Sequence, residues 1–131
     1  MKRRFRGPRK PTHEVQEDAA ARALPAGKRT PGSGCGWRPT HKGDATGGMF
    51  RASCKTRADP AAKTIRVKRE DLEEIRAQAL AVGQAPVFVF GWEGFDWAAL
   101  PLAKAELLMK AAAAVMDGDA GAAIRLLEGL A

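Results

Sequence analysis

The chain has 131 residues and a mass of 14.0 kDa, which suits one domain with a modest core and is too short for two of ordinary size. Its hydrophobic fraction of 45% is rich in alanine and contains no tyrosine, so we expect a small core concentrated in few segments. No apolar run is long enough to span a membrane or follows the basic N-terminus as in a secretory signal, so we expect a cytoplasmic protein without a membrane partner.

The charge is unevenly distributed. Residues 1–57 carry 14 Lys and Arg against 4 acids, whereas residues 58–131 carry 8 against 11. Such a basic half favours a polyanion partner, because neutralising phosphates releases counterions. For the first ten residues alone, a solubilising tail is an equally good interpretation. The cations expected to contact DNA are Arg3, Arg4, Arg6, Lys28, Arg29 and Lys42.

The first half of the chain begins with a predicted disordered basic arm over residues 1–11. A helix is predicted over 12–24, with Thr12 as its N-cap and acids in its first turns. Residues 28–44 contain many glycines and prolines and are predicted to be an irregular loop.

Two short strands follow, around "DAT" and "MFRASCK", joined by a hairpin turn at Gly47-Gly48. Side chains alternate along the second strand, so Arg51, Ser53 and Lys55 are predicted to face a cleft with Met49. The apolar residues between them, including Cys54 as a buried filler, are predicted to face the core.

The second half begins with "TIRV" as a predicted brief strand, followed by a helix that ends at Gly83. Its inward side chains are predicted to be Leu72, Ile75, Ala79 and Leu80. "APVFVFGW" is apolar on both faces and predicts a central strand, and "FDWAALPL" predicts another. "AKAELLMKAAAAVM" and "AGAAIRLLEGL" predict two helices joined by "DGD". This order predicts an α/β fold with a small mixed β-sheet flanked by helices.

The chemistry is concentrated at Asp44 and Lys55. A carboxylate at the end of one strand, followed on the neighbouring strand by a second carboxylate, one residue and a lysine, is a known arrangement for phosphodiester hydrolysis. The acids hold Mg²⁺, which polarises the phosphate and activates water, while the lysine stabilises charge or orients the nucleophile. Asp44 alone would also fit a turn aspartate after a glycine, and Lys55 a solvated strand lysine.

The chain resembles the PD-(D/E)XK nucleases, specifically phage proteins similar to archaeal-type Holliday junction resolvases. The resemblance rests on Asp44 and Lys55 together with "TPGSG", "KGD", "CKT", the "TIRV" run and a final "W…LP". The resemblance covers residues 12–103 and implies a restriction-endonuclease-like core there, with the basic arm at 1–11 and a C-terminal helical hairpin at 104–131. It also implies Mg²⁺ or Mn²⁺ as cofactor, branched or duplex DNA as partner, a homodimer, and the host cell cytoplasm as location.

Carried over by position, the resemblance implies that Glu17, with Glu14 nearby, is the helix glutamate of the site. Ser33 matches the serine of a glycine-serine-glycine loop that approaches the substrate backbone, although the same residues are common in turns. Asp44 matches the metal aspartate and Lys55 the lysine. The sequence departs from the pattern at Ser53, where the family has its second metal carboxylate.

A serine hydroxyl is a weak magnesium ligand, so Ser53 would impair the site and a glutamate in its place would be expected to raise metal affinity. The acids that open the next helix, Glu70, Asp71 and Glu74, could supply the missing ligand, or could simply favour the helix start. We therefore expect a metal-dependent, structure-selective DNA endonuclease, impaired by Ser53. The alternatives are an inactive nuclease-fold protein that binds DNA or docks on a phage assembly, and a basic structural protein.

Overall fold

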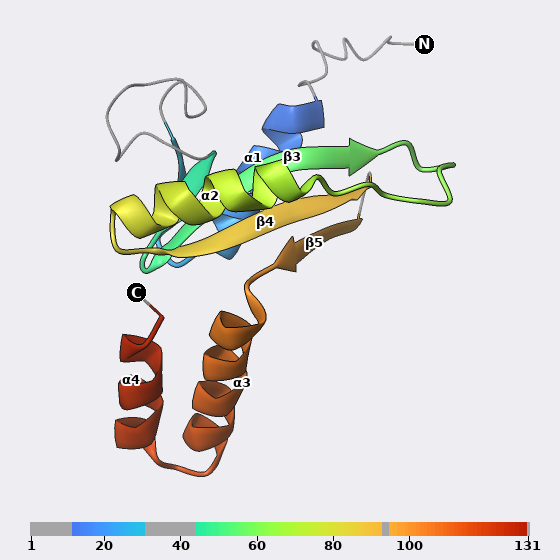
Figure 1. Ribbon diagram of the computed structural model, residues 1–131. Helices are drawn as coiled ribbons and strands as arrows, with labels where there is room; N and C mark the ends of the chain where they lie inside the picture. The colour runs from blue at the N-terminus through green and yellow to red at the C-terminus, as the bar shows by residue number, and fades with distance from the viewer. Residues whose placement is uncertain (1–11, 31–43, 93–94, 131) are drawn as a thin grey trace, which may run out of the picture.

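The computed structural model describes residues 12–30, 44–92 and 95–130, without the side chains of residues 12–14 and 55–57. This part of the chain contains four helices and five strands, and Figure 1 shows their arrangement. In chain order they are α1 (Thr12–Ala23), β1 (Lys28–Arg29), β2 (Ala45–Gly47), β3 (Phe50–Ala58), α2 (Arg69–Ala81), β4 (Ala85–Trp92), β5 (Phe95–Ala99), α3 (Leu102–Met116) and α4 (Ala120–Glu128).

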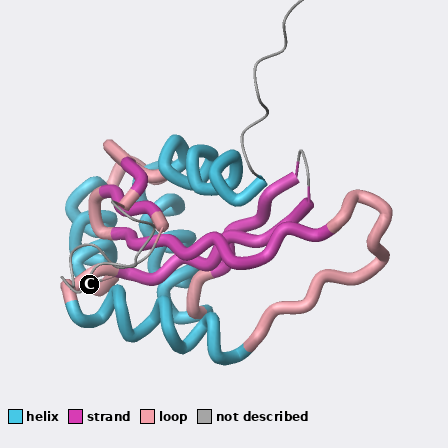
Figure 2. The backbone as a smooth tube through the Cα atoms, turned by 90° about the horizontal axis from the view of Figure 1, so that it is seen from above, coloured by secondary structure: helices cyan, strands magenta, loops and turns pink. Residues whose placement is uncertain are grey.

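The five strands form one mixed sheet in the order β1-β2-β3-β4-β5. Neighbouring strands are antiparallel except β3 and β4, which are parallel and are connected through α2. This agrees with the general requirement that parallel strands need a long crossover connection. Helix α1 packs on one face of the sheet and α2 on the other, as Figures 1 and 2 show. The predicted α/β fold with a small mixed sheet and a C-terminal helical pair is confirmed.

The core between α1 and the sheet is built largely from small side chains. Ala20 and Ala21 of α1 pack against Ala45, Ala52, Cys54, Val87 and Val89 of the strands. Alanines let a helix approach a sheet closely, at the cost of the larger apolar area that bulkier residues would bury. On the other face, Phe88 and Ile75 are almost fully buried. Strand β4 is therefore apolar on both faces and central, as predicted.

Three local predictions are wrong. "TIRV" is not a strand but an irregular connection in which Arg66 and Val67 are exposed, since no strand of the described sheet pairs with it. The predicted loop begins instead with β1, which pairs with β2 through Lys28 opposite Thr46 and Arg29 opposite Ala45. In α2, Leu72 and Leu80 are 40% and 76% exposed rather than inward, because only Ile75 and Ala79 of this helix are buried against the sheet.

The β2–β3 hairpin turns one residue later than predicted. Gly47 belongs to β2, and the turn is made by Gly48 with Met49, with Gly48 at φ +57°. Gly47 is required for packing, since a Cβ atom there would lie 2.6 Å from the carbonyl oxygen of Pro25. The hairpin is thus held close to the end of α1.

Helices α3 and α4 form an antiparallel pair that stands away from the sheet (Figure 1). The turn between them contains Gly118 at φ +79°, and the Asp119 side chain caps α4 by accepting a hydrogen bond from the Ala122 N–H at 2.9 Å. In the part of the chain described, no helix is both long and apolar enough to cross a membrane.

Candidate functional site

Asp44 lies immediately before β2 and is almost completely buried. Ala45 is the register partner of Ala52, yet the Asp44 N–H also donates to the Ala52 carbonyl at 2.8 Å. Two consecutive residues thus face one residue of β3, which is the arrangement of a β-bulge. The Asp44 carboxylate lies along β3, where its Oδ2 accepts a hydrogen bond from the Cys54 N–H at 2.6 Å.

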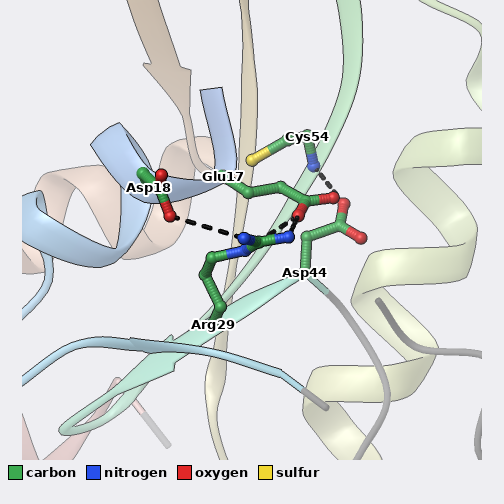
Figure 3. Close-up of polar contacts among 5 residues, drawn as sticks. All are labelled: Glu17, Asp18, Arg29, Asp44 and Cys54. Atoms are coloured by element: carbon green, nitrogen blue, oxygen red, sulfur yellow. Dashed lines mark hydrogen bonds and ion pairs between the residues drawn. The ribbon is translucent and has the colours of Figure 1, made fainter. Parts of the chain in front are cut away.

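Glu17 reaches the same region from α1. Its carboxylate is buried and accepts two hydrogen bonds from Arg29 of β1, at 2.7 Å from Nη2 and 3.1 Å from Nε. A third nitrogen, Nη1, lies 3.6 Å from Asp18. Figure 3 shows the Glu17 and Asp44 carboxylates beside Cys54, with the Arg29 guanidinium next to Glu17. We refer to Glu17, Arg29, Asp44 and Cys54 together as the Glu17–Asp44 site.

The pKa of the Cys54 thiol depends on the charges around this site. Burial first, and then the charges of Asp44, Glu17 and Asp96, raise the pKa of the Cys54 thiol far above its ordinary value of 9.0. A nucleophilic cysteine needs the thiolate, which requires a lowered pKa. The raised pKa favours the neutral thiol, and the burial of Cys54 in the core agrees with the predicted buried filler.

Asp96 of β5 is a further carboxylate near the thiol. It accepts a hydrogen bond from Gln16 Nε2 at 3.1 Å, and Gln16 is itself buried beside Glu17 on α1. The charges of Glu17, Asp44 and Asp96 all act on the Cys54 thiol, although β5, which carries Asp96, is separated from β3 by β4. Among the described residues, no set of three or more His, Cys, Asp and Glu side chains has the geometry of a metal site.

Ser53 and Arg51 lie on the other face of β3. Ala52 and Cys54 pack toward α1, so the alternation of the strand directs Ser53 toward α2. Arg51 donates from Nε to Gln84 Oε1 at 2.7 Å. Both residues are only 3% exposed. The prediction that these polar side chains line an open cleft is wrong, because α2 covers this face of the sheet.

The other acids considered for the site are on α2. Glu70 and Asp71 lie in its first turn, where their charges favour the helix dipole. Glu74 accepts a hydrogen bond from Gln78 of the same helix at 3.2 Å. Because α2 and α1 pack on opposite faces of the sheet, the structure does not bring these acids to Glu17 and Asp44.

The backbone of Lys55 lies in β3 at an irregular point, because the β3–β4 register shifts between Cys54 and Thr56. Its side chain is outside the description, as is that of Glu14. Ser33, Lys42, Arg3, Arg4 and Arg6 also lie outside the described residues. Of the remaining predicted DNA contacts, Lys28 is exposed on β1, whereas Arg29 binds Glu17 and Asp18.

Sequence reasoning missed the internal role of Arg29 and the position of Cys54 beside both carboxylates. The signal for Arg29 was weak, because it lies 12 positions after Glu17 and the segment between them contains a helix end and a turn. Thr30 was also missed. Its backbone N–H donates to the Asp44 carbonyl at 2.9 Å, and its hydroxyl is buried without a hydrogen-bond partner among the described residues.

Comparison with known proteins gives no identification: no family model, curated protein or solved structure matches the chain.

Proposed function

We propose that the protein is a metal-dependent DNA endonuclease related to the PD-(D/E)XK nucleases, with Glu17 and Asp44 as the ligands of Mg²⁺ or Mn²⁺. The observation that supports this most is the meeting of two buried carboxylates from different elements beside β3 (Figure 3). Arg29 pairs with Glu17 and the Cys54 N–H donates to Asp44, so the cost of burying these two carboxylates is offset within the chain and both can remain at this position. Two β-strand irregularities, at Asp44 and next to Lys55, lie on either side of Cys54 of β3. Such irregularities are common next to active sites.

The carboxylate oxygens of Glu17 and Asp44 are the type of ligand that a hard cation prefers. Mg²⁺ prefers oxygen ligands and is often held by only one or two carboxylates, with water and substrate phosphates at its other positions. The buried Thr30 hydroxyl adjoining Asp44 is the kind of group that an ordered water would satisfy. When bound, the metal would polarise the scissile phosphate and lower the pKa of a water.

The remaining roles belong to residues of the chain. The hydrogen bond from the Cys54 N–H fixes the Asp44 carboxylate. Arg29 holds the Glu17 carboxylate in place through hydrogen bonds from two of its nitrogens. In this proposal, Lys55 stabilises the phosphate charge, Ser33 approaches the DNA backbone, and the basic first half of the chain binds branched or duplex DNA.

A second function is DNA binding without cleavage, including docking on a phage assembly. Two observations favour it. The β3 residue next to both carboxylates is Cys54, whose neutral thiol brings no charge to a metal. Ser53 is directed toward α2 rather than toward Asp44. Either feature would leave Mg²⁺ weakly bound and cutting slow.

Metal binding and DNA cleavage, measured separately, distinguish the two functions. We expect Mn²⁺ to raise the melting temperature of the intact chain, because a ligand that binds only the folded state stabilises it. Asp44→Asn should abolish that rise and also abolish nicking of branched DNA. Asp117→Asn, which makes the same charge change in the α3–α4 turn, should preserve both.

A rise in melting temperature that is equal in Asp44→Asn and in the unaltered protein would refute Asp44 as a metal ligand. If Mn²⁺ binds through Asp44 but no DNA substrate is cut, the second function holds. Glu17→Gln should reduce the Mn²⁺ effect as well. A full effect in that variant would remove Glu17 from the ligand set.

A further inference from the structure

Helix α3 is apolar on two sides, and among the residues that the structure describes, α4 covers one of them. The side toward α4 includes Ala111, which is buried, and Lys104, whose Nζ donates to the Gly129 carbonyl at 3.0 Å. About half a turn away, at roughly 100° per residue, lie Leu102, Met109 and Met116. These three side chains are 80%, 62% and 86% exposed.

Apolar residues on this side form a regular stripe, in which Ala105 is half-buried and the others are exposed. Leu102, Met109 and Met116 are spaced by seven residues, and Ala105 and Ala112 lie three residues after the first two. This is the spacing of the a and d positions of a coiled coil. A helix that is apolar on nearly all sides belongs in the interior of an assembly rather than at a solvent boundary. We refer to these five residues as the α3 stripe.

We propose that the α3 stripe is the interface of a homodimer, in which it packs antiparallel against the same stripe of a second copy. The alternation of large and small side chains points to this occupant. In an antiparallel pair, a positions meet d positions, so each methionine would sit over an alanine of the second copy. In a parallel pair, methionine would meet methionine and alanine would meet alanine, which packs poorly.

The charge of the C-terminal helices also favours pairing with a second copy. Residues 102–130 carry three Lys and Arg and four acids, so the positive charge of the chain lies elsewhere. Beside the stripe, Glu106 and Lys110 form an ion pair at 2.6 Å and leave no net charge. Two copies can therefore meet here without repulsion, while a polyanion finds no cationic surface. The antiparallel orientation also places the two basic cores at opposite ends of the paired helices.

The two α3–α4 hairpins would then form a four-helix arrangement with the symmetric interface of a twofold dimer. The stripe is small compared with a standard interface of about 1,600 Å², so we expect dissociation in roughly the micromolar range. Because the contact is apolar, the dimer should persist at high salt. The inference does not depend on metal binding or on nuclease activity.

Sedimentation equilibrium of the intact chain without DNA tests the proposal. We expect a monomer–dimer equilibrium that salt does not weaken. Met109→Glu should shift it to monomer, with an unchanged helical circular dichroism signal, since this side chain is exposed within one copy. Ala103→Glu introduces the same charge at an exposed α3 position outside the stripe and should still dimerise. A protein that is monomeric throughout, or a dimeric Met109→Glu variant, would overturn the proposal.

Disulfide cross-linking tests the orientation, and keeps the proposal testable if Met109→Glu fails to fold. In a background of Cys35→Ser and Cys54→Ser, a Met109→Cys protein is mixed with size-tagged Ala112→Cys or Ala105→Cys protein. The antiparallel pair predicts a mixed disulfide with one of the alanine variants. Efficient self-linking of Met109→Cys would indicate a parallel pair, and no cross-link in any mixture would contradict contact through the stripe.

Discussion

At the scale of single residues, the surroundings of Cys54 raise the pKa of its thiol and so make the stability of the protein depend on pH. Its thiol is buried in the core and lies near three carboxylates, so the folded protein holds the thiol proton more tightly than the unfolded chain does. The thiol of the unfolded chain has its ordinary pKa of 9.0. Stability from this proton is therefore complete below that pH and is lost as the pH rises above it.

We predict that the free energy of unfolding falls more steeply above pH 9 in a Cys35→Ser protein than in the Cys35→Ser/Cys54→Ser variant. The difference should reach about 2 kcal/mol at roughly pH 10.5, since each pKa unit corresponds to about 1.4 kcal/mol. Urea denaturation at several pH values measures it. Parallel pH dependences in the two proteins would show that the Cys54 thiol ionises as readily in the folded state as in the unfolded one.

At the scale of elements, strand β3 separates two buried environments, and the sequence does not indicate which helix covers each of its faces. Cys54 faces α1 and the carboxylates, while Ser53 is buried toward α2. A carboxylate introduced at these two neighbouring positions should therefore behave in opposite ways, although either substitution could appear from the sequence to restore a metal ligand.

We predict that Ser53→Glu destabilises the protein by roughly 2–4 kcal/mol whether or not divalent metal is present, because it buries a charge beneath α2. Cys54→Asp should also destabilise the metal-free protein, but Mn²⁺ should restore much of the loss, because the new carboxylate joins Glu17 and Asp44. Melting temperatures with and without Mn²⁺ measure both effects. Selective stabilisation of Ser53→Glu by Mn²⁺ would place the metal on the α2 side instead.

At the scale of the whole molecule, the separation of charge predicts how DNA is bound. The N-terminal segment 1–10 contains six cations, and most of the remaining excess positive charge lies before residue 58. We predict that DNA affinity falls roughly tenfold or more between about 50 and 200 mM salt, as expected for several phosphate contacts.

Deletion of residues 1–10 should weaken binding and reduce this salt dependence, while Lys28→Ala should have a smaller effect of the same kind. Fluorescence anisotropy with labelled DNA provides the measurement, and the melting temperature serves as a control for folding. Affinity that does not change with salt would rule out an electrostatic basis for binding. A large loss of stability on deletion would show that the segment packs on the domain.

The sequence alone determined most elements and their type. Periodicity and breakers specified α1, α2, the β2–β3 hairpin, the central strand β4 and the C-terminal helices, because these signals act over a few neighbouring residues. The apolar run at 85–92 was sufficient to indicate a strand buried on both sides. The acids Glu17 and Asp44 were also identifiable as site candidates, although only through resemblance.

Only the tertiary structure decided which side chains meet. A bulge at Asp44 places its carboxylate on the Cys54 N–H, and β1 brings Arg29 to Glu17, and neither contact follows from spacing along the chain. The same holds for Ser53, whose side of the sheet depends on where α1 and α2 pack. Alternation in a strand fixes which residues share a face, but the layer that covers each face is set by contacts between distant segments.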